Sequence, residues 1–310
     1  MKQYFIVLSR ERLATPSRLL ALLLAMGLSL LLLSCSGKSN SGKSSSSAGI
    51  PTEYCDELVK LAEDGNAEAQ YNLALLYYMG EELTQSYPEA YKWLLKSAEQ
   101  GNAKAQYSLG TLYLQGQGVT QSYTEAIKWY RKSAEQGNSD AQFVLGGLYF
   151  QGQGISQSYT EAFKWYQKSA EQGDPRAEYF LSLCYWDGIG VAQSRSEGLD
   201  WLVKSAGQGF PNALYKYGEI LYDSRQYDTA MVMYALAAAK GFEKAVKMFN
   251  DWVVPMAKQG IAEAQYSMGL YYQQKDKIDD AIPWFTLSAE QGYQDAIKAL
   301  EEIKEADNKK

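Results

Sequence analysis

One stretch of the chain has the residues and spacing of a phosphate-binding loop. Gly37–Ser44 reads G-K-S-N-S-G-K-S and satisfies the pattern G-x4-G-K-[ST]. That pattern binds phosphate only where a strand leads into the loop and a helix follows it, because the N–H groups of the helix N-terminus must point at the phosphate. Here an apolar run precedes the loop and polyserine follows it. We therefore interpret residues 36–50 as a flexible Ser/Gly tether and not as a nucleotide site.

The other residues that could support catalysis are few. The chain has three Cys and no His, which argues against metal sites and against His-dependent acid–base catalysis. Cys55 and Cys184 are more than three repeat lengths apart on the spacing described below, too far for the ~7 Å limit on the Cα separation of a disulfide. Cys184 takes a position that leucines hold in neighbouring repeats, so we interpret it as a small buried residue. We predict a non-catalytic protein without metal or cofactor.

Residues 1–35 have the pattern of an export signal. A start with four basic residues and one acid precedes Leu19–Leu33, fifteen residues without a charge, which is shorter than the ~20 residues of a membrane-spanning helix. The run ends in Leu32-Leu33-Ser34-Cys35, which resembles a bacterial lipobox, although Leu33 stands where a smaller residue is usual. The resemblance implies a signal peptide, lipidation of Cys35 and, because Ser36 is not Asp, an outer-membrane protein facing the periplasm. A signal anchor or secretion are the alternatives.

The charge of the chain restricts its partners. The formal net charge is −6, and removal of residues 1–34 leaves 26 basic against 35 acidic side chains, a net charge of −9. Nucleic-acid binding depends on neutralising phosphates with Lys and Arg, so an acidic chain argues against it. It argues equally against electrostatic binding to anionic lipid, and we expect membrane contact through the lipid anchor only.

Regularly spaced glycines divide most of the chain into repeats. Gly65, Gly101, Gly137, Gly173 and Gly209 follow one another at intervals of 36 residues, a period typical of stacked supersecondary units. Two shorter units end at Gly241 and Gly292 and lack the Q-G-Q-G stretch found at 115–118 and 151–154. The predicted division is a capping helix at 51–65, four repeats at 66–209, a short repeat at 210–241, an extra helix at 242–260, a short repeat at 261–292, and a capping helix with tail at 293–310.

Each repeat has the pattern of a helix–turn–helix. In residues 102–137 the apolar positions of the first helix, helix A, fall on one face: Ala105, Leu109, Leu112 and Tyr113. Gly116 and Gly118 end that helix. Ser122 and Glu125 predict a capping box at the start of the second helix, helix B. Helix B turns Ala126, Trp129, Tyr130 and Ser133 inward and ends at Gly137, since glycine enters the left-handed conformation without steric cost. Gly110 keeps one position of helix A small.

These residues carry a family resemblance. The pattern A-x-x-x-L-G-x-x-Y-x-x-G-x-G-V…A-x-x-W-Y-x-K-S-A-E-Q-G resembles the Sel-one-like repeat (SLR) family of the tetratricopeptide superfamily, closely over 66–209 and in a degenerate form over 210–292. Ser86, Ser122, Ser158 and Ser194 stand where family members usually have Asp, and either residue can cap a helix. The resemblance implies an all-α, right-handed superhelical solenoid. It also implies a protein that acts as an adaptor for other proteins.

Two rows of mostly aromatic residues lie on helix A, and the resemblance implies that this face lines a concave groove. Residues seven apart lie within ~20° of one another on a helix. The first row is Tyr71, Tyr107, Phe143, Tyr179, Tyr215 and Tyr266; the second is Tyr78, Leu114, Phe150, Trp186, Tyr222 and Gln273. We expect the first row to pack between helices, with Tyr107 and Tyr179 kept as binding candidates. Tyr78, Phe150, Trp186 and Tyr222 of the second row are the better candidates, because Tyr and Trp bury much area at low entropic cost.

The expected function is that of a scaffold in the bacterial envelope that binds a protein or peptide, and mostly acidic neighbours of the rows favour a basic peptide. An enzyme is one alternative, because a cysteine-rich branch of the family is linked to β-lactamase or penicillin-binding activity. That branch ties each repeat with a disulfide, and Ser39–Ser45 lie in the tether, so no serine nucleophile has a supported context. Peptidoglycan or glycan binding is the other alternative, since sugars stack on Trp and Tyr as peptides do.

Overall fold

The computed structural model describes residues 52–80 and 83–308, which form helices joined by short turns. The expected all-helical array of stacked helix pairs is confirmed. No helix in this described part is long and apolar enough to cross a lipid bilayer. The lipidation candidate Cys35, the tether at 36–50 and the side chain of Cys55 lie outside the described residues.

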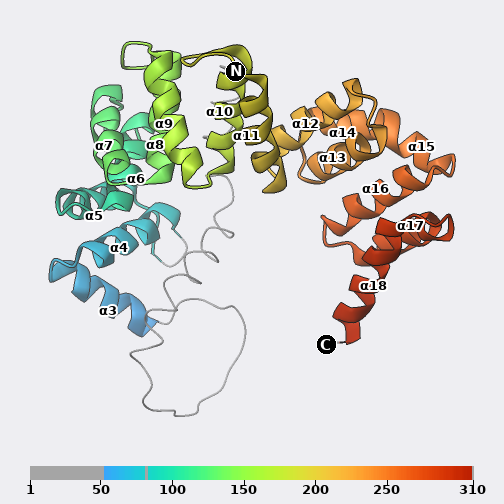
Figure 1. The fold of residues 1–310 in the computed structure, drawn as a ribbon. Coiled ribbons are helices and arrows are strands. Elements are labelled where there is room, and N and C mark those ends of the chain that lie inside the picture. The colour runs from blue at the N-terminus through green and yellow to red at the C-terminus, as the bar shows by residue number, and fades with distance from the viewer. Residues whose placement is uncertain (1–51, 81–82, 309–310) are drawn as a thin grey trace, which may run out of the picture. The chain divides into compact units, whose positions relative to one another are not determined.

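The chain forms two compact units, and the first ends at Ser158. Each helix of this unit packs against the helix that precedes it, and Figure 1 draws the series from blue to green (Figure 1). Its helices are α3 (Thr52–Glu63), α4 (Ala67–Met79), α5 (Tyr87–Glu99), α6 (Ala103–Gln115), α7 (Tyr123–Glu135) and α8 (Ser139–Gln151).

The second unit begins at Tyr159 and contains the remaining helices. They are α9 (Tyr159–Glu171), α10 (Pro175–Asp187), α11 (Arg195–Gly207), α12 (Pro211–Asp223), α13 (Tyr227–Ala239), α14 (Glu243–Met248), the π-helix η1 (Phe249–Val253), α15 (Val254–Lys258), α16 (Ala262–Gln273), α17 (Ile278–Glu290) and α18 (Gln294–Asn308). We number the repeats by their helices A and B: α4 and α5 form repeat one, α6 and α7 repeat two, α8 and α9 repeat three, α10 and α11 repeat four, α12 and α13 repeat five, and α16 and α17 repeat six.

Short polar residues and glycines fix both ends of helix A. Asn102 caps α6, and its side-chain oxygen accepts a hydrogen bond from the Ala105 N–H at 3.0 Å, which satisfies one of the N–H groups that a helix start leaves open. Gly116 ends α6 with φ of 70° and donates its N–H to the Leu112 carbonyl. The same arrangement ends the helices A of repeats one, three and four.

Helix B starts with a serine cap, but the predicted capping box is only half formed. The Ser122 hydroxyl accepts from the Glu125 N–H at 3.3 Å. The Ser122 N–H does not bond to Glu125; it donates to the Tyr113 carbonyl of helix A at 3.0 Å. Glu125 instead forms an ion pair with Lys128 at 3.3 Å. The expected bond from the Ser122 N–H to the Glu125 side chain was wrong, because that N–H already donates to the Tyr113 carbonyl where helix A and helix B meet.

Buried polar bonds join the two helices of repeats one, two, four and six. The Ser133 hydroxyl of helix B donates to the Ala103 carbonyl of helix A at 2.6 Å, and Gln136 donates to the side-chain oxygen of Gln106 at 2.6 Å. Equivalent serine bonds join Ser97 to Ala67, Ser205 to Pro175 and Ser288 to Ala262. These bonds fix the register of helix B against helix A.

A second buried bond joins repeats one, two, three and six to the helix that precedes each of them. Gln106 donates its amide to the Ala98 carbonyl near the end of the preceding helix B at 3.1 Å. Gln70, Gln142 and Gln265 make the same bond to Ala62, Ala134 and Ala257. Each glutamine therefore satisfies a carbonyl that a helix end leaves open and that the stack removes from water.

The apolar core lies between the two helices of each pair. Leu109 and Leu112 of helix A and Tyr130 of helix B are almost fully buried. A Cβ at Gly110 would stand only 2.9 Å from the Tyr130 ring. The predicted small position is therefore confirmed, because only glycine lets the ring lie against the backbone of α6.

The glycine turns that join helix A to helix B within a repeat also pack against the preceding repeat. Gly118 lies against the backbone of Tyr87, the first residue of helix B in repeat one, and a Cβ at Gly118 would overlap the Tyr87 carbonyl. Gly154 meets Tyr123 in the same way, and Gly190 meets Tyr159. The neighbouring glutamines add side-chain bonds: Gln117 accepts from the Tyr78 hydroxyl at 3.1 Å, and Gln153 donates to the Tyr123 hydroxyl at 3.0 Å. Each of these turns therefore packs against the start of helix B in the preceding repeat.

Residues 242–260 form a helical rod, α14–η1–α15, in the place where another repeat would stand. The rod begins as a helix A does. The Phe242 N–H donates to the Ala237 carbonyl at 3.2 Å, as the Asn102 N–H does to the Ser97 carbonyl. Phe242 thus stands where an asparagine cap stands in repeats one to three.

The rod ends as a helix B does. The Ile261 N–H donates to the Met256 carbonyl at 3.2 Å, and the Gln265 side chain of the next helix A bonds to Ala257. The rod thus joins the start of a helix A directly to the end of a helix B, and the π-helix η1 lies at the joint. A π-helical turn is a common solution where one extra residue must be accommodated in a helix.

A single rod in place of two helices reverses the direction of the helices that follow. The rod begins beside the end of α13, and its Trp252 ring lies 6.1 Å from the ring of Tyr227, the first residue of α13. The rod is therefore antiparallel to α13. After it, α16 turns back and packs on α13 in the same direction as α13. The turn between α16 and α17 consequently lies at the opposite edge of the unit from the turn between α12 and α13.

Replacing Gly118 with Ala should destabilise the protein more than the same change at Gly137. Both glycines have positive φ, 70° and 92°, so both variants bear the left-handed strain of about 1 kcal/mol. Only Gly118 also abuts a neighbouring backbone, whereas a Cβ at Gly137 meets nothing within 4 Å. We expect Gly118→Ala to lose roughly a further 1–3 kcal/mol in free energy of unfolding. Urea denaturation followed by circular dichroism measures both, and equal losses would contradict the role given to the turn.

Candidate binding surface

The first aromatic row of helix A lies inside the stack. The ring of Tyr107 is 5.7 Å from that of Tyr130 in its own helix B. The ring of Tyr179 is 5.6 Å from that of Phe210, which precedes the next helix A. Tyr215 meets Tyr234 and Phe242, and Tyr266 meets Phe285 and Tyr293, in the same manner. These rings fill the space between a helix B and the start of the following repeat, so their packing accounts for the row. Binding by Tyr107 and Tyr179 stays a prediction.

The second row lies at the end of helix A, beside the first residue of helix B. The rings of Tyr78 and Tyr87 are 5.4 Å apart, and burial raises the pKa of Tyr78. In repeat four the Arg195 guanidinium lies 6.0 Å from the centre of the Trp186 ring. Phe150 is half-buried, and its carbonyl accepts from the Gln157 amide at 2.8 Å. The second-row candidates therefore lie at the turn edge of their repeats, where they remain partly open to solvent.

Repeat five presents the most open second-row position. Tyr222 is 38% exposed, and its ring contacts those of Tyr227 at 5.3 Å and Trp252 at 5.0 Å. Tyr227, which begins α13, is 43% exposed. Sequence reasoning missed Tyr227 and Trp252. The sequence after repeat five has no glycine turn of this kind, whereas in repeats one to three a turn glycine packs on the residue equivalent to Tyr227. That absence could have indicated a different environment for Tyr227.

The tryptophans of helix B belong to the core. Trp93, Trp129 and Trp165 are buried, while Trp201 and Trp284 are half-buried. A lysine one turn further along the helix covers the outer face of the ring in four repeats: Lys96, Lys132, Lys168 and Lys204, at 3.8 to 4.3 Å from the ring centre. In these four repeats the lysine therefore already occupies the outer face of the tryptophan ring.

The described residues offer little for covalent or metal chemistry. Cys184 is buried, and burial followed by the nearby Asp187 carboxylate raises the pKa of its thiol to about 12. The thiol is therefore protonated near neutral pH, and the protonated form is a poor nucleophile. Within 52–80 and 83–308, no three His, Cys, Asp or Glu residues come together as a group that could hold a metal ion. The arrangement supports binding through aromatic surfaces.

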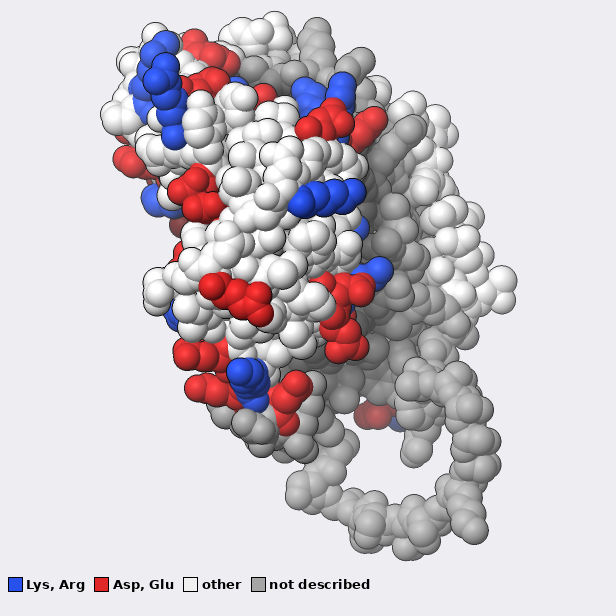
Figure 2. All heavy atoms as spheres, turned by 90° about the vertical axis from the view of Figure 1, so that its right-hand side faces the viewer, with Lys and Arg blue, Asp and Glu red and all other residues white. Residues whose placement is uncertain are grey.

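Charges on the surface are dispersed. Figure 2 looks onto the side that α15–α18 occupy in Figure 1 and shows acidic and basic groups scattered among uncharged residues (Figure 2). Several ion pairs are local to one helix, such as Lys216 with Glu219 at 3.1 Å. Exposed pairs of this kind contribute little to stability.

A family profile described as Sel1 repeat matches six segments of the chain. They are residues 67–102, 103–138, 139–174, 175–210, 211–242 and 262–293. The chain belongs to the Sel1 repeat family. The rod at 242–260 falls almost wholly between the fifth and sixth Sel1 repeats, which agrees with its single-helix structure.

Two solved Sel1 repeat structures are similar to this protein. One is c5321, described as a protective antigen of uropathogenic Escherichia coli with an SLR fold: 30% identity, TM-score 0.59, covering 80% of this chain. This chain spans 59% of the length of c5321. The other is a Sel1 repeat protein from Oxalobacter formigenes: 32% identity, TM-score 0.58, covering 64% of this chain and 85% of that one. No curated protein matches.

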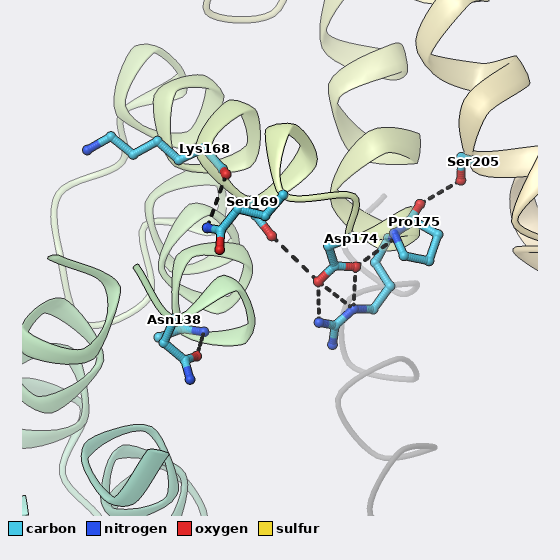
Figure 3. A network of polar contacts seen from close by, with 9 residues as sticks. Asn138, Lys168, Ser169, Asp174, Pro175 and Ser205 are labelled. Carbon is cyan, nitrogen blue, oxygen red and sulfur yellow. Dashed lines mark hydrogen bonds and ion pairs between the residues drawn. The ribbon is translucent and has the colours of Figure 1, made fainter. Parts of the chain in front are cut away.

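Sel1 repeat four departs from its neighbours by burying charged residues. Asp174 caps α10 by accepting from the Arg176 N–H at 2.9 Å, and its carboxylate also pairs with the Arg176 guanidinium (Figure 3). Asp174 is 9% exposed and Arg176 8%. The close pairing compensates both charges for the loss of water. Removing either partner alone would leave a buried charge without compensation.

Glu178 takes the place of the buried glutamine in Sel1 repeat four. It is 4% exposed, and its carboxylate accepts from the Gln208 amide at 2.8 Å. In other repeats the equivalent glutamine also donates to a carbonyl eight residues earlier, here that of Ala170. An ionised carboxylate has no proton to donate to that carbonyl. Burial raises the pKa of Glu178, and the Gln208 bond and the Lys204 ammonium partly oppose this rise.

Replacing Glu178 with Gln should stabilise this Sel1 repeat protein at neutral pH by about 1–2 kcal/mol, because the amide restores the missing donor. The pKa of Glu178 is higher in the folded than in the unfolded protein, so folding favours its protonated form. The penalty is therefore present at neutral pH and disappears as the pH falls below the ordinary glutamate pKa. Denaturant titrations at pH 7 and near pH 4 measure the difference between variant and parent, which should shrink at the lower pH.

The reverse change provides the control. Gln106→Glu removes the donor to Ala98 in Sel1 repeat two and should destabilise the protein by a similar amount at neutral pH. If Glu178→Gln left the unfolding free energy unchanged at both pH values, the buried carboxylate would carry no penalty and this account would be wrong.

Proposed function

We propose that this Sel1 repeat protein is a non-catalytic scaffold that binds a protein or peptide through the second-row positions of its repeats. The contrast between a constant frame and varied surface residues carries the proposal. In three repeats the equivalent serine of helix B donates the same hydrogen bond to the first carbonyl of helix A; these serines are Ser97, Ser133 and Ser205. The second-row residue changes along the same chain, from tyrosine to leucine, phenylalanine, tryptophan and tyrosine. A rigid frame with variable exposed side chains is suited to recognising an extended partner, because preorganisation lowers the entropy cost of binding.

Catalysis is the less supported function. A catalytic site needs different groups that converge on one reacting atom, whereas the polar residues of this frame recur in each repeat and bond to one another. Turnover of a chromogenic lactam by the purified protein is the observation that would favour a β-lactamase-like enzyme instead.

The scaffold is proposed to be anchored in a bacterial envelope by a lipid on Cys35, with residues 36–50 as a tether. The supporting observations are in the sequence: the uncharged run Leu19–Leu33 followed by Leu-Leu-Ser-Cys, and then a stretch of Ser and Gly. Outer-membrane placement facing the periplasm follows from Ser36. A signal anchor or secretion are the alternatives, and each predicts a different product at the N-terminus.

Substitution of Trp186 should weaken partner capture. Trp186→Ala removes a large ring from the turn edge of repeat four, and loss of a central aromatic contact costs about 1–4 kcal/mol of binding energy, at least roughly fivefold in affinity. The measurement is recovery of cross-linked partners by the tagged full-length protein in its native host. Leu287→Ala is the matched control, since Leu287 is an exposed apolar residue of α17 outside both rows. Equal recovery with Trp186→Ala and the parent would contradict the proposal.

Substitution of Cys35 should abolish lipid attachment. Metabolic labelling with a fatty-acid analogue is expected to mark the parent protein and to leave Cys35→Ala unlabelled. Cys55→Ala should keep the label, because only Cys35 follows the uncharged run. Labelling that persists in Cys35→Ala would rule out the lipid anchor and leave the signal-anchor or secreted alternatives.

A further inference from the structure

The turn between α12 and α13 carries a surface of exposed aromatic rings. Every residue from Tyr222 to Thr229 is exposed, and the rings of Tyr222, Tyr227 and Trp252 contact one another at 5.0 to 6.1 Å between centroids. Neighbouring planes are inclined by 67° to 87°. We call these three residues the repeat-five surface. Because the rings are in contact, they form one continuous aromatic surface, in which Tyr222 and Tyr227 are exposed and Trp252 is half-buried.

No turn of a following repeat packs on this surface. In repeats one to three a Gly of the turn in the following repeat packs on the first residue of helix B, although Tyr159 is still 44% exposed there. The element after repeat five is the α14–η1–α15 rod, which has no turn between two helices. Among the described rings, that of Trp252, at the π-helical joint, contacts both Tyr222 and Tyr227. Repeat five therefore has three adjoining rings at this position and no glycine turn packed on them.

The charges around the repeat-five surface are mainly acidic. Each ring has an exposed aspartate next to it in sequence: Asp223, Asp228 and Asp251. Arg225 is the basic residue of the turn. The rod has three lysines: Lys244 and Lys247 lie on α14, beside the opposite end of α13, and the exposed Lys258 lies at the other end of the rod, nearer this edge. Two nearby tyrosines, one buried and one half-buried, have pKa values that these and neighbouring carboxylates raise.

The first of these tyrosines is Tyr234, whose pKa is raised by burial and then by the carboxylates of Glu219 and Asp223. The second is Tyr293, at the start of α18. Burial, Asp295, the Tyr266 ring, Asp228 and Glu263 raise its pKa to about 12. The reversal of α16 brings Glu263 and Asp295 to the edge on which Asp228 lies. The reversed helices therefore add carboxylates to the side of the unit that carries the exposed rings.

The preceding repeat shows which group such an aromatic residue accepts. In repeat four the second-row residue is Trp186, and the first residue of helix B is Arg195, whose guanidinium lies 6.0 Å from the ring. In repeat five the same two positions are Tyr222 and Tyr227, so the cation–aromatic pair of repeat four has no counterpart at these two positions. A cation placed over an aromatic face and near carboxylates gains from both interactions.

We infer that the repeat-five surface is a docking site for an arginine- or lysine-bearing segment of a partner protein, with the cation over the faces of Tyr222 and Tyr227 and beside Asp223, Asp228 and Asp251. The inference rests on the proposed scaffold function and specifies the chemistry of one contact. It also assigns a role to the rod: by replacing a helix pair, it leaves this surface uncovered.

The test uses the full-length protein and two amidated hexapeptides, each with the same uncharged fluorophore at its blocked N-terminus. One has two arginines among alanines, and the other has glutamines in their places. Fluorescence anisotropy at low ionic strength should detect the arginine peptide with an affinity near about 1 mM or better, and the glutamine peptide at least about tenfold more weakly. Raising the salt concentration should weaken the arginine peptide only, because screening acts on the charge contacts.

Variants locate the site. Tyr222→Ala and Tyr227→Ala should each weaken arginine-peptide binding severalfold, and the double variant should abolish it. Tyr159→Ala is the matched control, because Tyr159 begins α9 in the same register and is 44% exposed. Asp223→Asn and Asp251→Asn keep the shape of the surface and should each reduce affinity about threefold. These conservative variants retain the test if an alanine variant unfolds.

Several outcomes would overturn the inference. They are binding of both peptides alike, no binding of the arginine peptide, or unchanged binding by the double tyrosine variant. Binding of an N-acetylglucosamine oligomer at these rings in place of the peptide would assign the surface to glycan. Self-association lost in Tyr227→Ala would assign it to a second copy. If Trp186→Ala recovers less partner but Tyr227→Ala leaves the affinity for the arginine peptide unchanged, the scaffold function stands and this inference fails.

Discussion

The hydrogen bond from a buried glutamine to the end of the preceding helix B is the contact on which the array depends. A helix of thirteen residues leaves its last four carbonyls without partners inside the helix, and stacking removes several of them from water. Gln70, Gln106, Gln142 and Gln265 each donate to one such carbonyl. The bond ties one repeat to the next and fixes their rotation and height. It also explains why a carboxylate at Glu178 is a strained substitute.

With that register fixed, the remaining positions fall into two classes. Gly110, Tyr130 and the helix B serines lie where the two helices of a pair meet, and their sizes and donors cannot change without loss of contact. The second-row residues lie at the turn edge, outside this frame. The same chain places tyrosine, leucine, phenylalanine and tryptophan there, because nothing in the frame restricts that side chain. Stability and recognition are therefore carried by different residues of one repeat.

At residues 242–260 the regular alternation of helix A and helix B is interrupted by a single rod. An ordinary repeat adds two antiparallel helices and returns the chain to the same edge, whereas one rod leaves it at the opposite edge. The consequences are local to the second unit. No turn of a following repeat packs on Tyr222 and Tyr227, and the Trp252 ring lies beside them. The reversed helices bring Glu263 and Asp295 to the same edge. One shortened element thus changes both the shape and the charge of a surface.

The sequence by itself determined the helix pairs, their caps and the small position at Gly110, because glycine spacing and apolar periodicity are set within one repeat. It also identified Trp186 and Tyr222, since residues seven apart share a helix face. Only the tertiary structure decided that the Ser122 N–H bonds to Tyr113, that Gly118 covers Tyr87, and that Tyr227 and Trp252 join Tyr222. Each of these joins residues from different helices, and their meeting depends on the angle and direction of the packed helices. The reversal caused by the rod has the same origin: local periodicity gives the length of a helix but not the edge at which it ends.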